Sequence, residues 1–341
     1  MLVYHYKQSG SAENYLELKF CVTGNTYCDK KSVICDACQL NSISGCTNKV
    51  STLDLLSFRF SAVHLAQFAR ANTAGGALTD KILNFRHPSS FTKILSIKAN
   101  HKIVSDSQEV MKFWATTPKL KAKSDFVWNS LDVNEKPETS TEERIRIRKD
   151  FYKAESDKIV IGLVGRINRW KGQKLLLEAF NILLKSNTNI KLVFLGSPPE
   201  NQEIFLTELE DKIKAFGLEN DVEIIPFQKE IWKFWDSVDI AVVPSTEPEP
   251  FGMVAIEAML CKKPVVASNH GGLTEIVLHN QTGFLFEPNN ENQLAEYLQK
   301  LIDSSDLRGD FGQKGHQRVL EHFSIDKHVQ KFEQIFEEIL R

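Results

Sequence analysis

Short apolar runs alternate with amphipathic stretches along the C-terminal half of the chain, from Ile159 onward. Ile159–Val164 contains only apolar residues and glycine, and Leu175–Lys185 repeats its apolar residues at helical spacing. Strands that alternate with helices indicate a parallel sheet with right-handed crossovers. Further strands are expected at Lys191–Gly196, Val222–Pro226, Ile240–Val243, Pro264–Ala267 and Gly283–Phe286. Further helices are expected at Glu203–Phe216, Ile231–Ser237, Met253–Cys261, Gly272–His279 and Asn292–Ile302.

The pattern is weaker in the N-terminal part of the chain. His101–Ser105 is typical of a strand and Ser107–Trp114 of a helix. The polar segment Glu135–Thr141 is expected to connect two domains, and Thr141–Tyr152 is expected to be a charged helix. Its basic residues are interpreted as a solvated face, and they are Arg144, Arg146, Arg148 and Lys149. At the other end of the chain, Ser324–Leu340 has apolar residues at helical spacing.

Length and composition narrow the class of protein. A chain of 341 residues favours two domains, and contents of 42% hydrophobic and 25% charged residues are ordinary for a globular protein. The formal net charge of −2 gives no indication of nucleic-acid binding. No apolar run approaches the length of a membrane span, and no signal-peptide pattern opens the chain. We therefore expect a cytoplasmic protein, for which peripheral contact with the inner face of the membrane stays open.

Two acids bracket a turn and a helix that follow the strand Asp239–Pro244. Glu249 stands before the turn, and Glu257 is the only polar residue in Met253–Leu260. In an open parallel sheet, ligands bind beyond the carboxyl ends of the strands. The N-terminus of a helix presents free N–H groups and a positive dipole end, which suit a phosphate. The sequence therefore predicts a phosphate site at the start of this helix.

The motifs around these acids resemble a known family. E-P-F-G-M-V-A-I-E at 249–257 is followed by K-P-V-V-A-S-N-H-G-G-L-T-E-I-V at 263–277 and T-G-F-L-F-E-P at 282–288. This series is similar to the donor-binding domain of the retaining glycosyltransferases of group 1, the family 4 type with GT-B architecture. The resemblance implies an α/β fold of two Rossmann-like domains. The complete one is expected over residues 141–323, the partial acceptor-side one over 1–140, and a helix over 324–341 is expected to cross back to the first domain.

The resemblance also implies roles for individual residues. Arg166 and Lys171 would meet the donor diphosphate, whose charge grows as the glycosidic bond breaks. Glu257 would accept hydrogen bonds from the ribose, and Glu249 would lie by the donor sugar. His5 ends an early strand and would reach the sugar from the other domain, although histidine–tyrosine stands here in place of the usual histidine–aspartate. The predicted binding residues are Gly165, Arg166, Lys171, Phe227, Gly252, Met253, Val254 and Glu257, and the predicted catalytic residues are Glu249 and His5.

Two further points limit these roles. Eight residues of helix would separate Glu249 from Glu257 by ~12 Å, beyond the ~5–5.5 Å of a retaining glycosidase pair. A nucleotide clamp and a sugar-side acid therefore suit the two acids better. Two interpretations of His270 stay open, an ordinary loop histidine and a site residue. Glu275 lies one turn into the next helix.

Three functions remain open on this basis. The first is a retaining hexosyltransferase that moves a sugar from a UDP-sugar or GDP-sugar to a hydroxyl of a glycan or lipid-linked acceptor, in surface polysaccharide or glycolipid synthesis. No cofactor or metal is expected, because Arg166, Lys171 and the helix dipole can neutralise the diphosphate. The second is a non-catalytic or truncated nucleotide-sugar-binding protein, because the family's opening strand, glycine-rich loop and helix are not recognised. The third is an epimerase or phosphorylase of the same architecture.

Five of the six cysteines fall in one window. They are Cys21, Cys28, Cys35, Cys38 and Cys46. The C-x2-C spacing of Cys35 and Cys38 suits zinc, but the second such pair of a usual zinc site is missing. In a cytoplasmic protein free thiols are favoured over disulfides, and no metal site is predicted. Cys261 is expected in the core.

Overall fold

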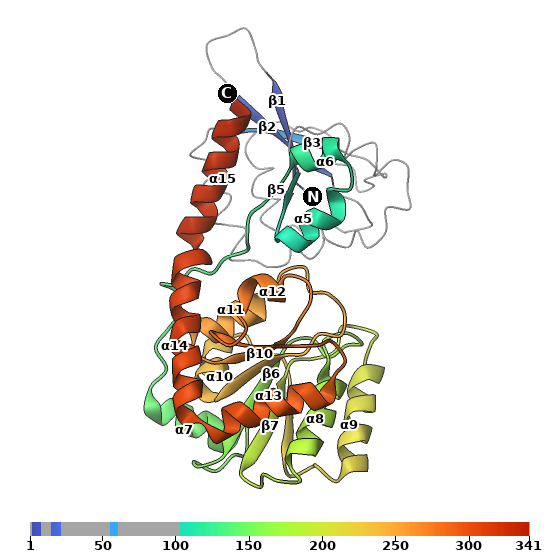
Figure 1. The fold of residues 1–341 in the computed structure, drawn as a ribbon, viewed down its shortest axis with the longest axis vertical. Coiled ribbons are helices and arrows are strands. Elements are labelled where there is room, and N and C mark those ends of the chain that lie inside the picture. Colours follow the sequence, from blue (N-terminus) through green and yellow to red (C-terminus); the bar gives the residue numbers. More distant parts are fainter. Residues whose placement is uncertain (1, 8–14, 22–54, 61–102, 341) are drawn as a thin grey trace, which may run out of the picture.

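The computed structural model describes residues 2–7, 15–21, 55–60 and 103–340 (Figure 1). Its strands form one sheet of five and one sheet of six. In Figure 1 the two sheets lie in separate bodies joined along one side by the C-terminal helices. Within the described residues no helix is both long and apolar enough to span a membrane.

The C-terminal sheet is parallel throughout. Its strands are β6 (Ile159–Val164), β7 (Ile190–Leu195), β8 (Val222–Ile225), β9 (Ile240–Val243), β10 (Val265–Ser268) and β11 (Gly283–Phe286), in the order β11-β10-β9-β6-β7-β8. The strands are almost wholly buried, because helices cover both faces of a parallel sheet. All six strands predicted for this part are present, and the predicted α/β fold with a parallel sheet is confirmed.

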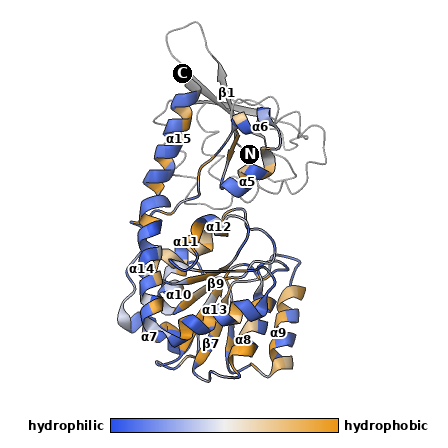
Figure 2. Cartoon of the chain, viewed as in Figure 1, coloured by the Kyte–Doolittle hydropathy of each residue, from blue (hydrophilic) through white to orange (hydrophobic). Residues whose placement is uncertain are grey.

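Helices cover this sheet as the amphipathic pattern predicts. They are α8 (Gln173–Leu183), α9 (Ile204–Phe216), α10 (Ile231–Ser237), α11 (Met253–Leu260), α12 (Leu273–Ile276) and α13 (Glu291–Asp303). Two apolar cores result, one on each face: α8 and α13 pack on one, and α10 and α11 on the other. Figure 2 shows the hydrophobic colour concentrated on the strands, whereas the helices around them carry both colours.

In this half one predicted helix boundary is corrected and one helix is added. The helix expected over Gly272–His279 ends at Ile276, because Val277 is extended and His279 forms a bridge with Gly283. A long helix, α14 (Ser305–His322), was not predicted. Its three glycines lower the helix propensity that the sequence shows. Gly312 is required by packing, since an added Cβ would lie 2.1 Å from the carbonyl oxygen of Lys262.

The N-terminal sheet is mainly antiparallel. Its strands are β1 (Leu2–Lys7), β2 (Tyr15–Cys21), β3 (Leu55–Phe60), β4 (Ile103–Ser105) and β5 (Ser124–Phe126), in the order β3-β2-β1-β4-β5. Only β4 and β5 pair in parallel, whereas a Rossmann-like domain would place its strands in parallel. The helices α5 (Gln108–Trp114) and α6 (Pro118–Lys123) join β4 to β5. The short α6 was not predicted, and it begins at Pro118 after the N-cap Thr117.

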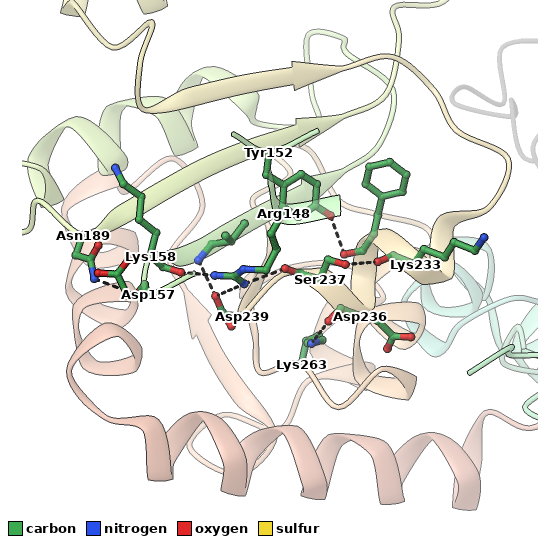
Figure 3. A network of polar contacts seen from close by, with 12 residues as sticks. Arg148, Tyr152, Asp157, Lys158, Asn189, Lys233, Asp236, Ser237, Asp239 and Lys263 are labelled. Atoms are coloured by element: carbon green, nitrogen blue, oxygen red, sulfur yellow. Dashed lines mark hydrogen bonds and ion pairs between the residues drawn. The ribbon is translucent and has the colours of Figure 1, made fainter. Parts of the chain in front are cut away.

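Figure 3 shows a polar network that holds α7 (Thr141–Asp150) to the C-terminal sheet. Arg148 Nη1 contacts Asp239 Oδ2 at 3.0 Å and the carbonyl oxygen of Ser237 at 3.1 Å. The same oxygen of Asp239 accepts a bond of 2.7 Å from Val160 N. The prediction of a wholly solvated basic face on α7 is therefore wrong for Arg148, which is paired and mostly buried. Val160 and Asp239 stand at the amino ends of β6 and β9. This network therefore lies at the end of the sheet opposite to the carboxyl ends of the strands.

Two distant segments run between the sheets side by side. Leu131 N donates to the carbonyl oxygen of Phe323 at 2.9 Å, and Ile325 N donates to that of Leu131 at 3.0 Å. From there α15 (Ile325–Leu340) runs beside the N-terminal elements in Figure 1. The ring of His328 on α15 donates through Nδ1 to the carbonyl oxygen of Trp128 at 2.6 Å.

The buried His328 should make folding sensitive to acid. Burial lowers the pKa of His328 below its ordinary value of 6.5, although the bond to Trp128 opposes this. As the pH falls below 6.5, His328 therefore takes up a proton in the unfolded chain before it does so in the folded chain. The free energy of unfolding decreases as the pH falls. We expect the melting temperature of His328→Gln to fall less than that of the wild type between about pH 7.5 and about pH 5.5. The exposed His322→Gln is the control, and equal acid sensitivity of all three proteins would contradict the expectation.

Candidate functional site

A buried ion pair lies at the carboxyl ends of the central strands. Lys171 Nζ, on the loop after β6, is 2.6 Å from Glu249 Oε1, on the loop after β9. Ser245 Oγ donates to the same oxygen at 2.6 Å. The Glu249 side chain is only 5% exposed, so these two partners offset the cost of burying a carboxylate. The structure thus brings together two predicted site residues that lie 78 positions apart in the sequence.

The loop that carries Lys171 is folded by its own polar groups. Asn168 Oδ1 accepts from Trp170 N at 3.1 Å and from Lys171 N at 3.0 Å. The loop ends at Gly172, the N-cap of α8, with φ of +79°. A Cβ on Gly172 would lie 1.9 Å from the carbonyl oxygen of Pro244, the residue before Ser245. The loops after β6 and β9 therefore pack backbone to backbone, which fixes Lys171 beside Glu249.

Arg166 and Gly165 lie on the same loop, at its start. The carbonyl oxygen of Arg166 accepts from Gln173 Nε2 at 2.9 Å, which ties the start of the loop to α8. The Arg166 side chain is exposed. Two predicted phosphate ligands, Arg166 and Lys171, thus share one loop, although only the lysine is in contact with the predicted catalytic acid.

The predicted helix start is present at α11. Gly252 is its N-cap with φ of +119°, and a Cβ there would lie 2.7 Å from Leu273 Cδ2. Met253 and Val254 form the first turn and are partly buried. The first N–H groups of a helix have no partner inside the helix, and they carry the positive end of its dipole. An anion placed here would meet these groups.

Glu257 lies one turn further along α11. Its Oε2 accepts from Trp235 Nε1 at 3.3 Å. Burial raises the pKa of Glu257, while the bond from Trp235 and the positive charge of Lys171 lower it. Lys171 therefore acts on both acids of the motif. A half-buried carboxylate with a free oxygen position suits a ligand that donates hydrogen bonds, such as a pair of hydroxyls.

The structure places Phe227, His270 and the backbone of His5 on three different elements or loops. Phe227 follows β8, is 69% exposed, and its N–H donates to Ser197 Oγ at 3.0 Å. His270 donates through Nε2 to the carbonyl oxygen of Ser245 at 2.8 Å, so it supports the residue that holds Glu249. The backbone of His5 lies in β1 opposite Glu17, and its side chain falls outside the described structure. The role of His5 stays a prediction.

Sequence reasoning missed two residues of this site. Ser245 directly follows the strand Asp239–Pro244, and that position at a carboxyl end was the available signal. Trp235, which is fully buried on α10, gave no signal because its helix precedes the site and shows only an apolar pattern.

In the ranges that the structure describes, no group of three or more His, Cys, Asp or Glu side chains could hold a metal ion. The cysteine cluster lies outside these ranges except for the backbone of Cys21, so the choice between thiols and zinc stays open. Cys261 is buried as predicted, and burial raises the pKa of its thiol.

The known proteins that this chain resembles include glycosyltransferases. Residues 144–318 match the family model described as glycosyl transferases group 1. A capsular polysaccharide biosynthesis glycosyltransferase, CapM of Staphylococcus aureus, is 30% identical over 197 residues, which is 58% of this chain and 50% of that protein. A lipopolysaccharide 1,2-N-acetylglucosaminetransferase of Salmonella typhimurium is 32% identical over 183 residues, which is 52% of this chain and 48% of that protein.

A solved structure agrees with these relatives. Anabaena HepE in complex with UDP and glucose aligns with a TM-score of 0.66 and 25% identity, over 72% of this chain and 66% of that one. The matching solved structures include further glycosyltransferases. The chain spans about half the length of the curated relatives described above.

Proposed function

The chain belongs to the group 1 glycosyl transferases, and from this membership we propose that it transfers a hexose from a nucleoside-diphosphate sugar to an acceptor hydroxyl with retention of configuration. The observation that carries the proposal is the Lys171–Glu249 pair beside the N-terminus of α11. This arrangement supplies a cation and free backbone donors at one point, which a leaving diphosphate requires.

UDP is the donor nucleotide that we favour. HepE, at 25% identity, was solved with UDP and glucose bound. In the present chain the exposed Phe227 at the end of β8 offers an apolar face and backbone groups to a base. Glu257 would accept hydrogen bonds from the ribose hydroxyls. A GDP-sugar remains the alternative to be compared in the same assays.

The residues divide the chemistry between them. The bond between the anomeric carbon and the diphosphate oxygen breaks, and a bond from the acceptor oxygen to the same carbon forms on the same face. The acceptor proton passes to a phosphate oxygen of the leaving diphosphate. Arg166, Lys171 and the dipole of α11 neutralise the charge that the diphosphate gains, so the reaction needs no metal ion in this proposal. Glu249 holds Lys171 and lies beside the donor sugar.

The acceptor is proposed from the relatives alone. Capsular polysaccharide and lipopolysaccharide enzymes are among them. We therefore propose a glycan or lipid-linked hydroxyl as the acceptor, in the synthesis of a surface polysaccharide or glycolipid. The cytoplasmic location, with the protein in contact with the inner face of the membrane, belongs to the same proposal.

Turnover of the donor tests the proposal. The full chain is incubated with UDP-hexoses and GDP-hexoses, with EDTA, and with and without a panel of glycan and lipid-linked acceptors. Release of UDP that depends on an acceptor, with the anomeric configuration kept in the product, is the expected result. Nucleotide binding without turnover under any condition would favour the non-catalytic binding protein instead.

Glu257→Ala should weaken the binding of UDP. Removal of a carboxylate that accepts bonds from the ribose costs about 1.5–3 kcal/mol, which is about 10-fold to 150-fold in affinity. Titration calorimetry with UDP measures the change, and UDP affinity should be unchanged in the control Glu296→Ala, an acid on the outer face of α13. Equal affinities in both variants would contradict the ribose assignment.

A further inference from the structure

A carboxylate of the C-terminal half reaches across to the N-terminal half of the structure. Glu275, on the short α12, accepts a hydrogen bond of 3.0 Å from Gln108 N through Oε2 and one of 2.9 Å from Glu109 N through Oε1. Both N–H groups belong to the first turn of α5. Each oxygen of the carboxylate is therefore used by a different amide, and its charge faces the positive end of α5.

Trp128 provides a third donor to the same carboxylate. Its Nε1 lies 2.6 Å from Glu275 Oε2. The tryptophan is held from other sides, because its ring packs against Phe323 with centroids 5.3 Å apart and its carbonyl oxygen accepts from His328. Glu275 thus contacts both α5 and the segment that crosses between the sheets, and Trp128 links it to His328 of α15.

A second contact between the halves lies beside the first. Ser107, the fully buried N-cap of α5, donates through Oγ to the carbonyl oxygen of Pro250 at 2.6 Å and accepts from Val110 N at 3.2 Å. Pro250 directly follows Glu249. The start of α5 therefore touches both the α12 turn and the loop of the predicted catalytic acid.

The α12 turn and the loop of Glu249 are in direct backbone contact. Gly272 N donates to the carbonyl oxygen of Glu249 at 2.8 Å. A Cβ on Gly271 would lie 2.4 Å from that same oxygen, so the backbones are in direct contact. Arg318 of α14 fixes the far side of the turn by donating to the carbonyl oxygens of Glu275 at 2.7 Å and Ile276 at 2.9 Å. A displacement of α5 against Glu275 would therefore be a displacement against Glu249.

We propose that Glu275 is a positioning residue that fixes the N-terminal sheet, through α5, against the loop of Glu249. The helix α5 follows β4 after two residues, so its start sets where the carboxyl end of β4 lies. If the N-terminal half holds the acceptor, Glu275 sets the acceptor hydroxyl at its distance from the donor sugar. This last step rests on the function proposed above, whereas the fixation of α5 does not.

Hydrogen exchange tests the fixation directly. In Glu275→Gln the side chain keeps its shape but has one oxygen for three donors and no charge. We expect the amides of Gln108 and Glu109 to exchange about tenfold faster or more, because a charge-assisted bond at each is weakened. Glu210→Gln, at an exposed site on α9, is the matched control and should exchange at the wild-type rate in this segment. Wild-type exchange at both amides of Glu275→Gln would overturn the proposal.

A second variant keeps the test decisive if Glu275→Gln fails to fold. Trp128→Phe retains a ring in the packed position and removes one donor from Glu275. We expect faster exchange in the first turn of α5, with a smaller change than in Glu275→Gln. Exchange at the wild-type rate in this variant would count against the proposal.

Kinetics separate positioning from general stability. We expect Glu275→Gln to keep its UDP affinity within about twofold, because the nucleotide contacts lie elsewhere, and to lower kcat of transfer by about tenfold. Equal losses of UDP affinity and kcat would overturn the positioning role. If the wild type shows no transfer at all, the proposed function fails, and the exchange experiment still decides whether Glu275 fixes α5.

Discussion

Lys171→Ala should lose most of its UDP affinity and part of its stability together. The variant lacks the cation for the diphosphate, which is worth about 1.5–3 kcal/mol of binding as a charge-assisted contact. It also leaves the buried Glu249 carboxylate with only the hydroxyl of Ser245 as a side-chain partner among the described residues, and breaking a buried pair in this way costs about 3–5 kcal/mol. Calorimetry with UDP and urea unfolding measure the two losses.

The double variant Lys171→Ala, Glu249→Gln separates the two effects. A neutral glutamine removes the uncompensated charge and can still accept from Ser245, so stability should recover by about 2 kcal/mol or more relative to Lys171→Ala. UDP affinity should not recover, since the cation is still absent. If the double variant is as unstable as the sum of the two single variants, the pair does not hold the loops as described.

Gly172→Ala should destabilise the fold far more than an equivalent change elsewhere. Its Cβ would lie 1.9 Å from the carbonyl oxygen of Pro244, and neither backbone segment can move without shifting Lys171 or Ser245. We expect a loss above about 3 kcal/mol in the free energy of unfolding, together with lost UDP binding.

Gly217→Ala is the matched control for Gly172→Ala. Gly217 has a similar φ of +69°, but nothing lies within 4 Å of an added Cβ. It should cost only about 1 kcal/mol, the price of a left-handed alanine, and leave UDP binding unchanged. Similar losses in both variants would show that the contact between the two loops is not what requires glycine at position 172.

The C-terminal half could be predicted from sequence because its signal is local. Each buried parallel strand is a continuous apolar run, as in Ile159–Val164, and each helix repeats its apolar face. The glycines of α14 concealed a helix, and two of the three, Gly312 and Gly315, serve packing against Lys262 and Met259, which the pattern cannot show. The antiparallel pairing of β2 with β3 joins residues that are at least 34 positions apart (Cys21 with Leu55, 55 − 21) and carries no comparable local signal.

The sequence predicted which residues form the candidate site better than it predicted the contacts between them. Spacing and resemblance pointed to Lys171, Glu249 and Glu257, but the direct pairing of Lys171 with Glu249 is a consequence of how two loops pack. The contacts of Glu275 were also hidden, because two of its three donors are backbone N–H groups, which every residue but proline carries.

The most direct test of the central claim is a crystal structure of the full chain with UDP. We expect the β-phosphate to contact Lys171 Nζ and the N–H groups of the first turn of α11, and the ribose hydroxyls to contact Glu257. A diphosphate bound away from Lys171 and the start of α11, with Lys171 paired only to Glu249, would contradict the claim.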